Sequence, residues 1–518
     1  MSLFAVLRFA SYSDGVKAAL GLVVVVVLLR LPTLAEPAWH PDEGIFTAVA
    51  MWSSHGVPLY AGIFDNSPPG IYWLYQALIW LGALDHHVVV QLADLIAVMA
   101  ATLFTYLIAS RMLSRGGAVL AAVLCAVGLS LPTLDGDVLN VEMAALPFFM
   151  ASLWLVLRRD SEATDVVAGG LLAIALLIRP SFALDAIAVL TVLLITNRPI
   201  RRVLFVAVGG TAVMSLAALV LWRQGAMQAY LQVALPSEHA YLVWSNGGNL
   251  VPLAIRLVLL GLLTVFAFRA LRGADLRLLA IWLPAAVAGA SLTPRELTHY
   301  VHEAMPPLTI AVAALMVRIA QRPRALPGES AQGWRWALVV PASALVALAG
   351  AEAVLVLPAQ ETAFVTRTSA PRPFLHFFGF PHLPDYYGNW LAYISGRESA
   401  ARYHAGFPVP IDRDLGESSL LQATAGKDGR LLVLGDRPWL YVWSRLRPAT
   451  RFVAQNSGYR MVPFADEETR AALDGRRADV VVLADASPGD WEARLQSDGY
   501  QPLSAAPWPT FVVTGIVR

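Results

Sequence analysis

The sequence predicts a polytopic α-helical membrane protein with about eleven spans and a small C-terminal extracytoplasmic α/β domain. Three observations support this prediction. The chain is 57% hydrophobic and only 14% charged, whereas an ordinary soluble domain carries about 25% charged residues. Apolar runs long enough to cross a bilayer recur through the first two thirds of the chain. Proline and charged residues then become frequent after Pro358.

A membrane-spanning helix needs roughly 20 mostly apolar residues. The runs that approach this requirement are 17–34, 88–110, 117–134, 141–157, 166–178, 181–197, 202–222, 250–270, 278–293, 303–319 and 336–357. The two short runs that meet at Arg179-Pro180 predict either tilted spans or a hairpin joined at the outer surface. The run 70–84 is short and begins with Pro68-Pro69-Gly70, so we expect a helix that lies on the interface or dips into it.

Basic residues set the predicted orientation, because Lys and Arg gather in cytoplasmic loops. If 70–84 does not cross, the basic residues of the short loops all face one side. They are Arg8, Lys17, Arg111, Arg115, Arg158, Arg159, Arg198, Arg201, Arg202, Arg272, Arg277, Arg322, Arg324 and Arg335. Loop 35–87 has no Lys or Arg. We therefore expect a cytoplasmic N-terminus, with loop 35–87 and residues 358–518 outside.

The first span has an alternative interpretation. Its apolar core from Val23 to Leu29 is short enough for a cleaved signal peptide, although the many later spans make a retained signal anchor sufficient.

Two domains are predicted, a membrane domain at 1–357 and an extracytoplasmic α/β domain at 358–518. In the second, the apolar runs 430–435 and 478–483 predict buried strands, and 465–474 and 489–498 predict helices beside them. The formal net charge of +1 gives no reason to expect a nucleic-acid partner. One cysteine, Cys125, excludes both a disulfide within the chain and a cysteine-based metal site.

The first outer loop carries the most informative motifs. They are Trp39-His40-Pro41-Asp42-Glu43, then Gly56-x-Pro58-x-Tyr60, and then Phe64-Asp65-x-x-Pro68-Pro69-Gly70. Proline suits the first position of a helix and acids suit its first turn. Asp42 and Glu43 are therefore open to a structural interpretation, as acids that complement a helix dipole. Asp65-Asn66 before a double proline is likewise typical of a turn.

Later outer loops hold further polar residues with two possible interpretations. Asp135-Gly136-Asp137 and Glu142 occur in the second outer loop, and can be a polar loop tip or a second acidic group. Arg179 ends a span, where it can reach the interface by snorkelling or bind an anion. A late loop holds Arg295, His299, Tyr300 and His302, which can anchor the chain at the membrane surface or bind substrate.

Taken in order, the first-loop motifs resemble those of the polyprenyl-phosphate-sugar-dependent membrane glycosyltransferases with the C-type fold. This superfamily includes the protein O-mannosyltransferases and the lipid A aminoarabinose transferases. The resemblance covers most of the chain. It implies that Asp42 is catalytic, with Glu43 adjacent. Ser67 stands where the family often has a lysine that meets the donor phosphate, so the chain departs from the family at that contact.

The resemblance extends to the later loops. Asp137 and Glu142 lie where the family places a second acidic group, and Arg179 lies where members often carry Lys or Arg. His299-Tyr300 before Pro306-Pro307 resembles the last outer loop of the family, and Gly435-Asp436 resembles the outer domain of bacterial members.

The implied reaction moves a sugar from a polyprenyl phosphate to an extracytoplasmic hydroxyl acceptor, which is a protein, a glycolipid or a polysaccharide. Asp42 is the expected general base in a one-step, inverting displacement, and Arg179 is the expected clamp on the donor phosphate. Further candidates for donor or substrate binding are Arg295, His299, Tyr300, Asp65, Asp137 and Glu142. The partners expected are the lipid-linked donor, the acceptor and the bilayer, and the expected location is a bacterial inner membrane.

No cofactor is expected to be required. A divalent cation remains possible, since Asp42, Glu43, Asp137 and the histidines are competent ligands, but no compact spacing such as His-Glu-x-x-His occurs.

Two rival functions remain open on the sequence. The first is a transporter or glycolipid flippase, although transporters usually place charges near the bilayer midplane and show internal repeats. The second is a non-catalytic protein whose outer domain binds glycan. Transfer of label from a polyprenyl-phosphate sugar distinguishes the enzyme from both.

Overall fold

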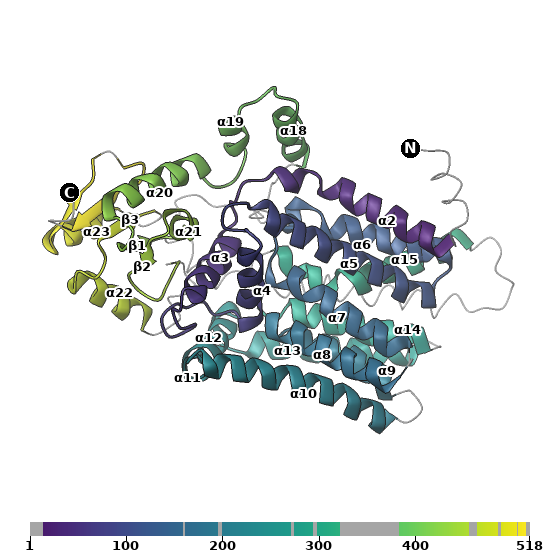
Figure 1. Ribbon diagram of the computed structural model, residues 1–518. Coiled ribbons are helices and arrows are strands. Elements are labelled where there is room, and N and C mark those ends of the chain that lie inside the picture. Colours follow the sequence, from purple (N-terminus) through teal and green to yellow (C-terminus); the bar gives the residue numbers. More distant parts are fainter. Residues whose placement is uncertain are drawn as a thin grey trace. The chain divides into compact units, whose positions relative to one another are not determined.

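The computed structural model describes residues 14–158, 161–194, 199–270, 274–293, 298–321, 383–454, 464–484, 488–504 and 506–513 (Figure 1). The chain divides into two compact units. The first comprises Met1–Leu34, Gln91–Met214 and Ser245–Pro381, and the second comprises Ala35–Val90, Ser215–Trp244 and His382–Arg518. The predicted boundary at 357/358 and the predicted span 336–357 lie outside the described residues.

The described part of the first unit is built from helices (Figure 1). The long helices are α2 (Asp14–Arg30), α5 (Val88–Met112), α6 (Arg115–Leu129), α7 (Val141–Arg158), α8 (Glu162–Ile178), α9 (Phe182–Leu194), α10 (Pro199–Arg223), α13 (Val251–Ala270), α14 (Ala274–Ala290) and α15 (Met305–Gln321). Two short 3-10 helices, η2 (Pro132–Leu134) and η4 (Thr298–Ala304), lie between them. A helix therefore occupies every predicted span that falls in the described residues.

Four of the described helices are long and apolar enough to cross a membrane. They are Val88–Met112, Val141–Arg158, Pro199–Arg223 and His299–Val317. Four shorter apolar helices are Arg115–Leu129, Phe182–Leu194, Val251–Phe266 and Arg277–Ala290. The membrane character of the chain is thus supported, whereas the number of crossings and their orientation stay predictions.

Helices α8 and α10 approach each other at two glycines. A Cβ atom on Gly169 would overlap the carbonyl oxygen of Val206, and one on Gly209 would overlap the carbonyl oxygen of Val166. Small residues of this kind let helix backbones pack closely within a membrane, where packing replaces the hydrophobic driving force. The same helix α10 exposes large apolar side chains, including Ile200 and Leu204, as expected of a lipid-facing surface.

The second unit combines segments that lie far apart in the sequence. From the first outer loop come α3 (Pro41–Ser54) and α4 (Pro69–Trp80). Residues 227–245 form α11 (Met227–Ala229), the π-helix η3 (Tyr230–Ala234) and α12 (Leu235–Ser245). The C-terminal helices are α18 (Leu383–Ile394), α19 (Ala400–His404), α20 (Ile411–Ala425), α21 (Trp439–Ser444), α22 (Ala465–Asp474) and α23 (Pro488–Ser497). The helix within 70–84 is confirmed as α4, and its depth in the bilayer stays a prediction.

A five-stranded sheet forms the centre of the C-terminal part, in the order β2-β1-β3-β5-β4. The strands are β1 (Arg430–Leu434), β2 (Arg447–Pro448), β3 (Val480–Leu483), β4 (Tyr500–Pro502) and β5 (Thr510–Val513). Strands β2, β1 and β3 run parallel, and β5 is antiparallel to β3 and β4. Both predicted strands and both predicted helices of this part are confirmed.

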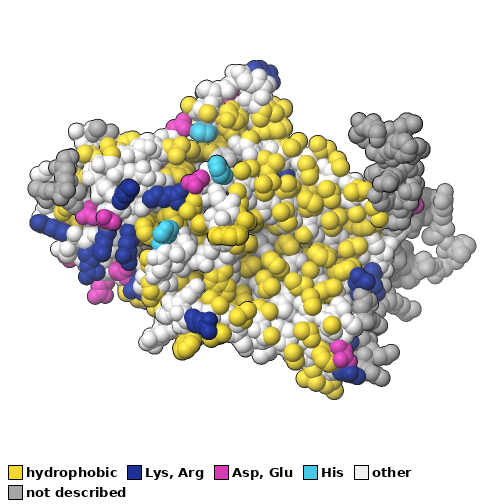
Figure 2. Space-filling view, viewed as in Figure 1, with side chains coloured by type: hydrophobic (Ala, Val, Ile, Leu, Met, Phe, Trp, Pro, Cys, Tyr) yellow, Lys and Arg dark blue, Asp and Glu magenta, His cyan; other side chains and the backbone are white. Residues whose placement is uncertain are grey.

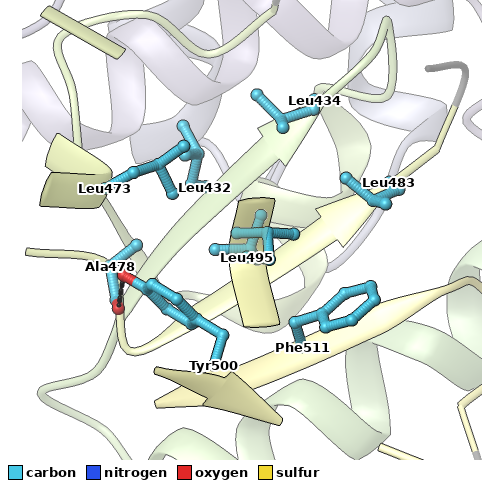
Figure 3. Close-up of a cluster of buried hydrophobic side chains, with 9 residues drawn as sticks. Leu432, Leu434, Leu473, Ala478, Leu483, Leu495, Tyr500 and Phe511 are labelled. Carbon is cyan, nitrogen blue, oxygen red and sulfur yellow. Dashed lines mark hydrogen bonds between the residues drawn. The ribbon is translucent and has the colours of Figure 1, made fainter. Parts of the chain in front are cut away.

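One face of the sheet buries a continuous apolar cluster (Figure 3). Because successive strand residues point to opposite faces, Leu432 and Leu434 lie on the same side of β1. Leu473 of α22 and Leu495 of α23 cover them. The hydroxyl group of Tyr500 closes the edge of the cluster by donating to the carbonyl oxygen of Ala478 at 2.9 Å.

The loop that follows β1 lies directly against α3. A Cβ atom on Gly44 would come within 2.8 Å of Pro438 Cγ and 3.0 Å of the indole ring of Trp439. The Trp439 Nε1–H group also donates to the backbone carbonyl of His40 at 2.9 Å. The start of α3, which carries Asp42 and Glu43, is therefore fixed by a residue almost 400 positions away in the sequence.

Candidate active site

The start of α3 separates its two neighbouring acids. Pro41 occupies the first helical position, and the Asp42 N–H group donates to Nδ1 of His40 at 3.3 Å, as a capped helix start requires. Asp42 is partly exposed, and its carboxylate makes no hydrogen bond or ion pair with any described residue. Glu43 is buried and lies against the interior of the unit. Of the two acids, Asp42 is the one available to a ligand.

Glu43 has a specific partner in His87. His87 Nε2 lies 2.9 Å from Glu43 Oε2. Burial alone would lower the pKa of His87, but the charge of Glu43 and its hydrogen bond outweigh burial, so the pKa of His87 is raised. The ring of Trp439 meets His87 edge-on, at 5.8 Å between centroids. Sequence reasoning missed His87 and Trp439, because nothing in the sequence relates position 439 to the first outer loop.

The turn that follows α3 is held by hydrogen bonds among its own polar groups. Asp65 accepts hydrogen bonds from the Ser67 N–H group, at 3.3 Å, and from the hydroxyl group of Tyr72. Tyr60, in the left-handed region at φ +63°, donates from its hydroxyl group to the carbonyl oxygen of Ser67 at 2.9 Å. The turn predicted at Asp65-Asn66 is thus present, while a role for Asp65 in substrate binding stays a prediction.

In the first unit, two predicted site residues, Glu142 and Tyr300, contact the guanidinium group of a third, Arg179. Arg179 Nη2 lies 2.9 Å from Oε1 of the fully buried Glu142. The guanidinium carbon of Arg179 lies 4.8 Å from the centre of the Tyr300 ring, over its face. The Arg179 side chain retains 16% exposure. This arrangement holds the guanidinium by charge on one side and by an aromatic face on the other.

A hydrogen-bonded chain continues behind Arg179. Arg179 Nε donates to Ser181 Oγ at 3.1 Å, and that hydroxyl donates to Glu303 Oε2 at 2.6 Å. In the same unit, Trp282 Nε1 donates to Asp185 Oδ1 at 2.9 Å, and the side chains of Asp185 and Glu303 are both buried.

The space for this chain is created by a glycine, since a Cβ atom on Gly289 would overlap Glu303 Oε1. Ser181, Asp185, Trp282 and Glu303 were not predicted. They come from different elements, and each looks unremarkable within its own apolar segment.

A second buried pair joins the second outer loop to η4. His299 Nδ1 lies 2.9 Å from Asp135 Oδ2, and both side chains are buried. Asp135 adopts the left-handed conformation, at φ +54°. Asp137, the residue that the sequence favoured, is fully buried. Neither ring nitrogen of the buried His302 has a hydrogen-bond partner within the described residues. Arg295 lies outside the described residues, so its predicted role stays a prediction.

Among the residues that the structure describes, no three His, Cys, Asp or Glu side chains converge as metal ligands. The expectation that no cofactor is required stays a prediction.

Comparisons with known proteins agree on the kind of fold. Residues 66–222 match the family model described as dolichyl-phosphate-mannose-protein mannosyltransferase. No curated protein sequence matches the chain. ArnT from Cupriavidus metallidurans bound to undecaprenyl phosphate aligns over 96% of this chain and 98% of its own, at 15% identity and a TM-score of 0.54. The same protein in the apo state aligns over 98% and 100%, at 15% identity and a TM-score of 0.52.

A more distant likeness is to the Archaeoglobus fulgidus oligosaccharyltransferase AglB in complex with an inhibitory peptide and a dolichol-phosphate. It aligns over 90% of this chain and 69% of its own, at 13% identity and a TM-score of 0.43. The alignment with ArnT runs through nearly the whole of both chains and shows a shared fold. At the level of the fold, the resemblance that the sequence predicted is confirmed.

Proposed function

We propose that this chain, which has the fold of the C-type membrane glycosyltransferases, is an inverting transferase at a bacterial inner membrane. It moves a sugar from a polyprenyl-phosphate-linked donor to an extracytoplasmic hydroxyl acceptor. The observation that carries the proposal is the state of Asp42, an accessible carboxylate without a partner among the described residues. It is held on a capped helix start, next to an acid that is already engaged.

In the proposed reaction, Asp42 is the general base. A hydroxyl group is a weak nucleophile, and a carboxylate within hydrogen-bond reach removes its proton as the oxygen attacks the anomeric carbon. The bond from that carbon to the phosphate oxygen breaks, and its electron pair leaves with the phosphate. A single displacement of this kind inverts the anomeric centre. Glu43 is a poorer candidate for the base because its carboxylate is buried and already contacts His87.

Arg179 is the proposed clamp on the donor phosphate. A guanidinium offers several N–H donors in a planar fork that matches phosphate oxygens. Glu142, Ser181 and Tyr300 restrict the orientation of Arg179, so little reorganisation is needed when the phosphate arrives. Charge that develops on the leaving phosphate is then stabilised electrostatically.

The identity of the donor rests on the comparisons. The matched family model is named for a dolichyl-phosphate-mannose-dependent enzyme, and the ArnT structure contains undecaprenyl phosphate. A polyprenyl phosphate is common to both, and we propose that it carries the donor sugar. The distribution of Lys and Arg predicts that the first outer loop and the C-terminal part lie outside, where such donors deliver their sugars. We propose that no divalent cation is required, so chelation of metal should leave transfer intact.

The test uses the purified full chain reconstituted in liposomes. It measures transfer of a radiolabelled sugar from polyprenyl phosphate to acceptors taken from native membranes. Asp42→Asn should abolish transfer while the protein stays folded and inserted. Asp466→Asn is the matched control, because Asp466 is an exposed acid in the first turn of α22. If both variants keep full transfer, Asp42 only complements a helix dipole and the mechanism is wrong. Translocation of label without transfer would instead identify a transporter.

A further inference from the structure

Helix α18 exposes two large aliphatic side chains to which the described part of the chain contributes little cover. Leu391 is 47% exposed and Ile394 is 54% exposed. They are three residues apart, which places them on one face of the helix, next to the partly buried Tyr387. Figure 2 shows hydrophobic side chains together with basic ones over the α18–α19 hairpin. An apolar stripe of this kind is a candidate contact surface.

The opposite face of α18 is already used to attach the helix. Tyr386 is buried, and its hydroxyl group donates to the carboxylate of Glu36. Asn389 Nδ2 donates to the carbonyl oxygen of Tyr403 at 3.0 Å. Tyr393 stacks on the ring of Tyr403, at 4.4 Å between centroids and 5° between planes. The orientation of the helix is therefore fixed, and the apolar stripe points away from the protein that holds it.

Chain connectivity restricts where this helix can lie. Its anchor, Glu36, follows the predicted span 17–34 by two residues and Arg30, the last residue of α2, by six residues. At no more than about 3.6 Å per residue, Glu36 stays within about 22 Å of the end of α2. A helix attached to Glu36 is therefore tethered close to the bilayer surface.

The composition of the hairpin matches that location. Aromatic residues are enriched at membrane–water interfaces, and Tyr387 and the partly buried Trp390 flank the aliphatic side chains. Arg397 and Arg402 are exposed in the turn after α18 and in α19. Basic residues at this level attract anionic lipid headgroups. A helix with an apolar stripe, aromatic flanks and neighbouring arginines is typical of one that lies in the interface plane.

We propose that the α18–α19 hairpin is an interfacial anchor that inserts Leu391 and Ile394 into the outer leaflet. Arg397 and Arg402 bind the phosphates of the headgroups around it. The anchor goes beyond the proposed function and does not depend on it, because it concerns the lipid surface and uses none of the residues assigned to catalysis. It gives the C-terminal α/β part a second attachment to the membrane, in addition to its covalent link.

The test uses single cysteines in the full chain, reconstituted in liposomes. Cys125 is the only cysteine, so Cys125→Ala provides the background. A fluorophore is attached in turn to Leu391→Cys, Ile394→Cys, Asp385→Cys and Ser419→Cys. Asp385 lies on the same helix but about 120° from Leu391, and Ser419 is an exposed residue of α20. Lipids that carry a nitroxide quencher near the headgroup report the depth of each label.

We expect quenching at positions 391 and 394 to exceed that at 385 and 419 by at least about twofold, with a blue-shifted emission, as for apolar residues in the headgroup region. Equal quenching at 391 and 419 overturns the proposal, even if sugar transfer is normal. Arg397→Gln combined with Arg402→Gln should remove the extra quenching at 391 that anionic phosphatidylglycerol produces over phosphatidylcholine. If the extra quenching survives this double change, the arginines are not the headgroup contacts.

Discussion

His87 Nε2 and Glu43 Oε2 lie 2.9 Å apart, and this contact commits one of two neighbouring acids to the interior. The acid that precedes it in the sequence, Asp42, stays partly exposed at the same helix start. Two carboxylates that the sequence presents as equivalent therefore have different surroundings. Their different surroundings make the division of roles between them testable.

The pH dependence of stability should report on His87. Its pKa is raised in the folded protein above the ordinary value of 6.5. A raised histidine pKa contributes stability that is fully present below about pH 6.5 and is lost as pH rises through the higher folded value. The melting temperature should therefore fall over that range, and His87→Gln should flatten the fall. Thermal unfolding in detergent measures this, and a variant with the unaltered slope contradicts the assignment.

Substitution of the two acids should separate activity from stability. Asp42→Asn should reduce transfer by about 10²–10⁴-fold, the usual contribution of a general base, with little change in melting temperature. Glu43→Gln should instead cost about 1–3 kcal/mol of stability, because it leaves a buried partner incompletely satisfied, and should keep most of the transfer. Rates of label transfer and melting temperatures of both variants show which acid supports catalysis and which supports stability. The opposite result would make Glu43 the base.

Ser181 should act as a positioning residue for Arg179. Ser181→Ala removes the link between the Arg179 guanidinium and Glu303, and a misplaced binding group can cost up to about 10²-fold in rate. We expect the KM for the donor to rise about tenfold, as a partial loss of that positioning, while the KM for the acceptor is unchanged. Ser181→Thr keeps the hydroxyl group and should restore the donor KM.

The matched control for Ser181 is Ser152→Ala, which removes another buried serine whose hydroxyl group donates to the carbonyl of Ala168 at 2.8 Å. Its donor KM should stay at the level of the unaltered protein. Equal effects of both alanines would show that Ser181 has only a general structural role.

The contact between α8 and α10 should not tolerate a methyl group. Gly169→Ala and Gly209→Ala each place a Cβ atom on a backbone carbonyl of the other helix, and overpacking of this kind typically costs about 1–3 kcal/mol. Gly170→Ala is the matched control, because its Cβ atom would meet its nearest neighbour at an ordinary 3.4 Å. Melting temperatures in detergent should fall for the first two variants alone. A stable Gly169→Ala variant would mean that the two helices can separate.

Local sequence features predicted the elements of this protein well. The helix at Pro41 follows from proline and acids in a first turn, and the strands at 430–435 and 478–483 follow from short buried apolar runs. Arg179, Glu142 and Tyr300, which come from separate predicted outer loops, lie in contact, while their roles in binding stay predictions. All of these signals are local, or come from a resemblance that covers most of the chain.

Contacts between distant segments were not predictable from the sequence. The hydrogen bond from Trp439 to the carbonyl of His40 depends on how a loop after a strand packs on a helix. The pairing of His299 with Asp135 depends on how η4 packs beside a residue in the left-handed conformation, far from it in the sequence. Asp185 and Glu303 sit in segments whose apolar content hid them. Each case needs tertiary packing, which periodicity and spacing do not contain.

The helix start at Pro41 has a consequence for how this chain chooses its reactive group. Consecutive residues of an α-helix project about 100° apart, so the helix start at Pro41 gives Asp42 a partly exposed position and Glu43 a buried one. Inserting an alanine between Pro41 and Asp42 would move the first acid into the buried position. The second acid would then take the place of Gly44, where even a Cβ atom meets Pro438 and Trp439. A proline that carries no charge therefore decides which acid meets the solvent.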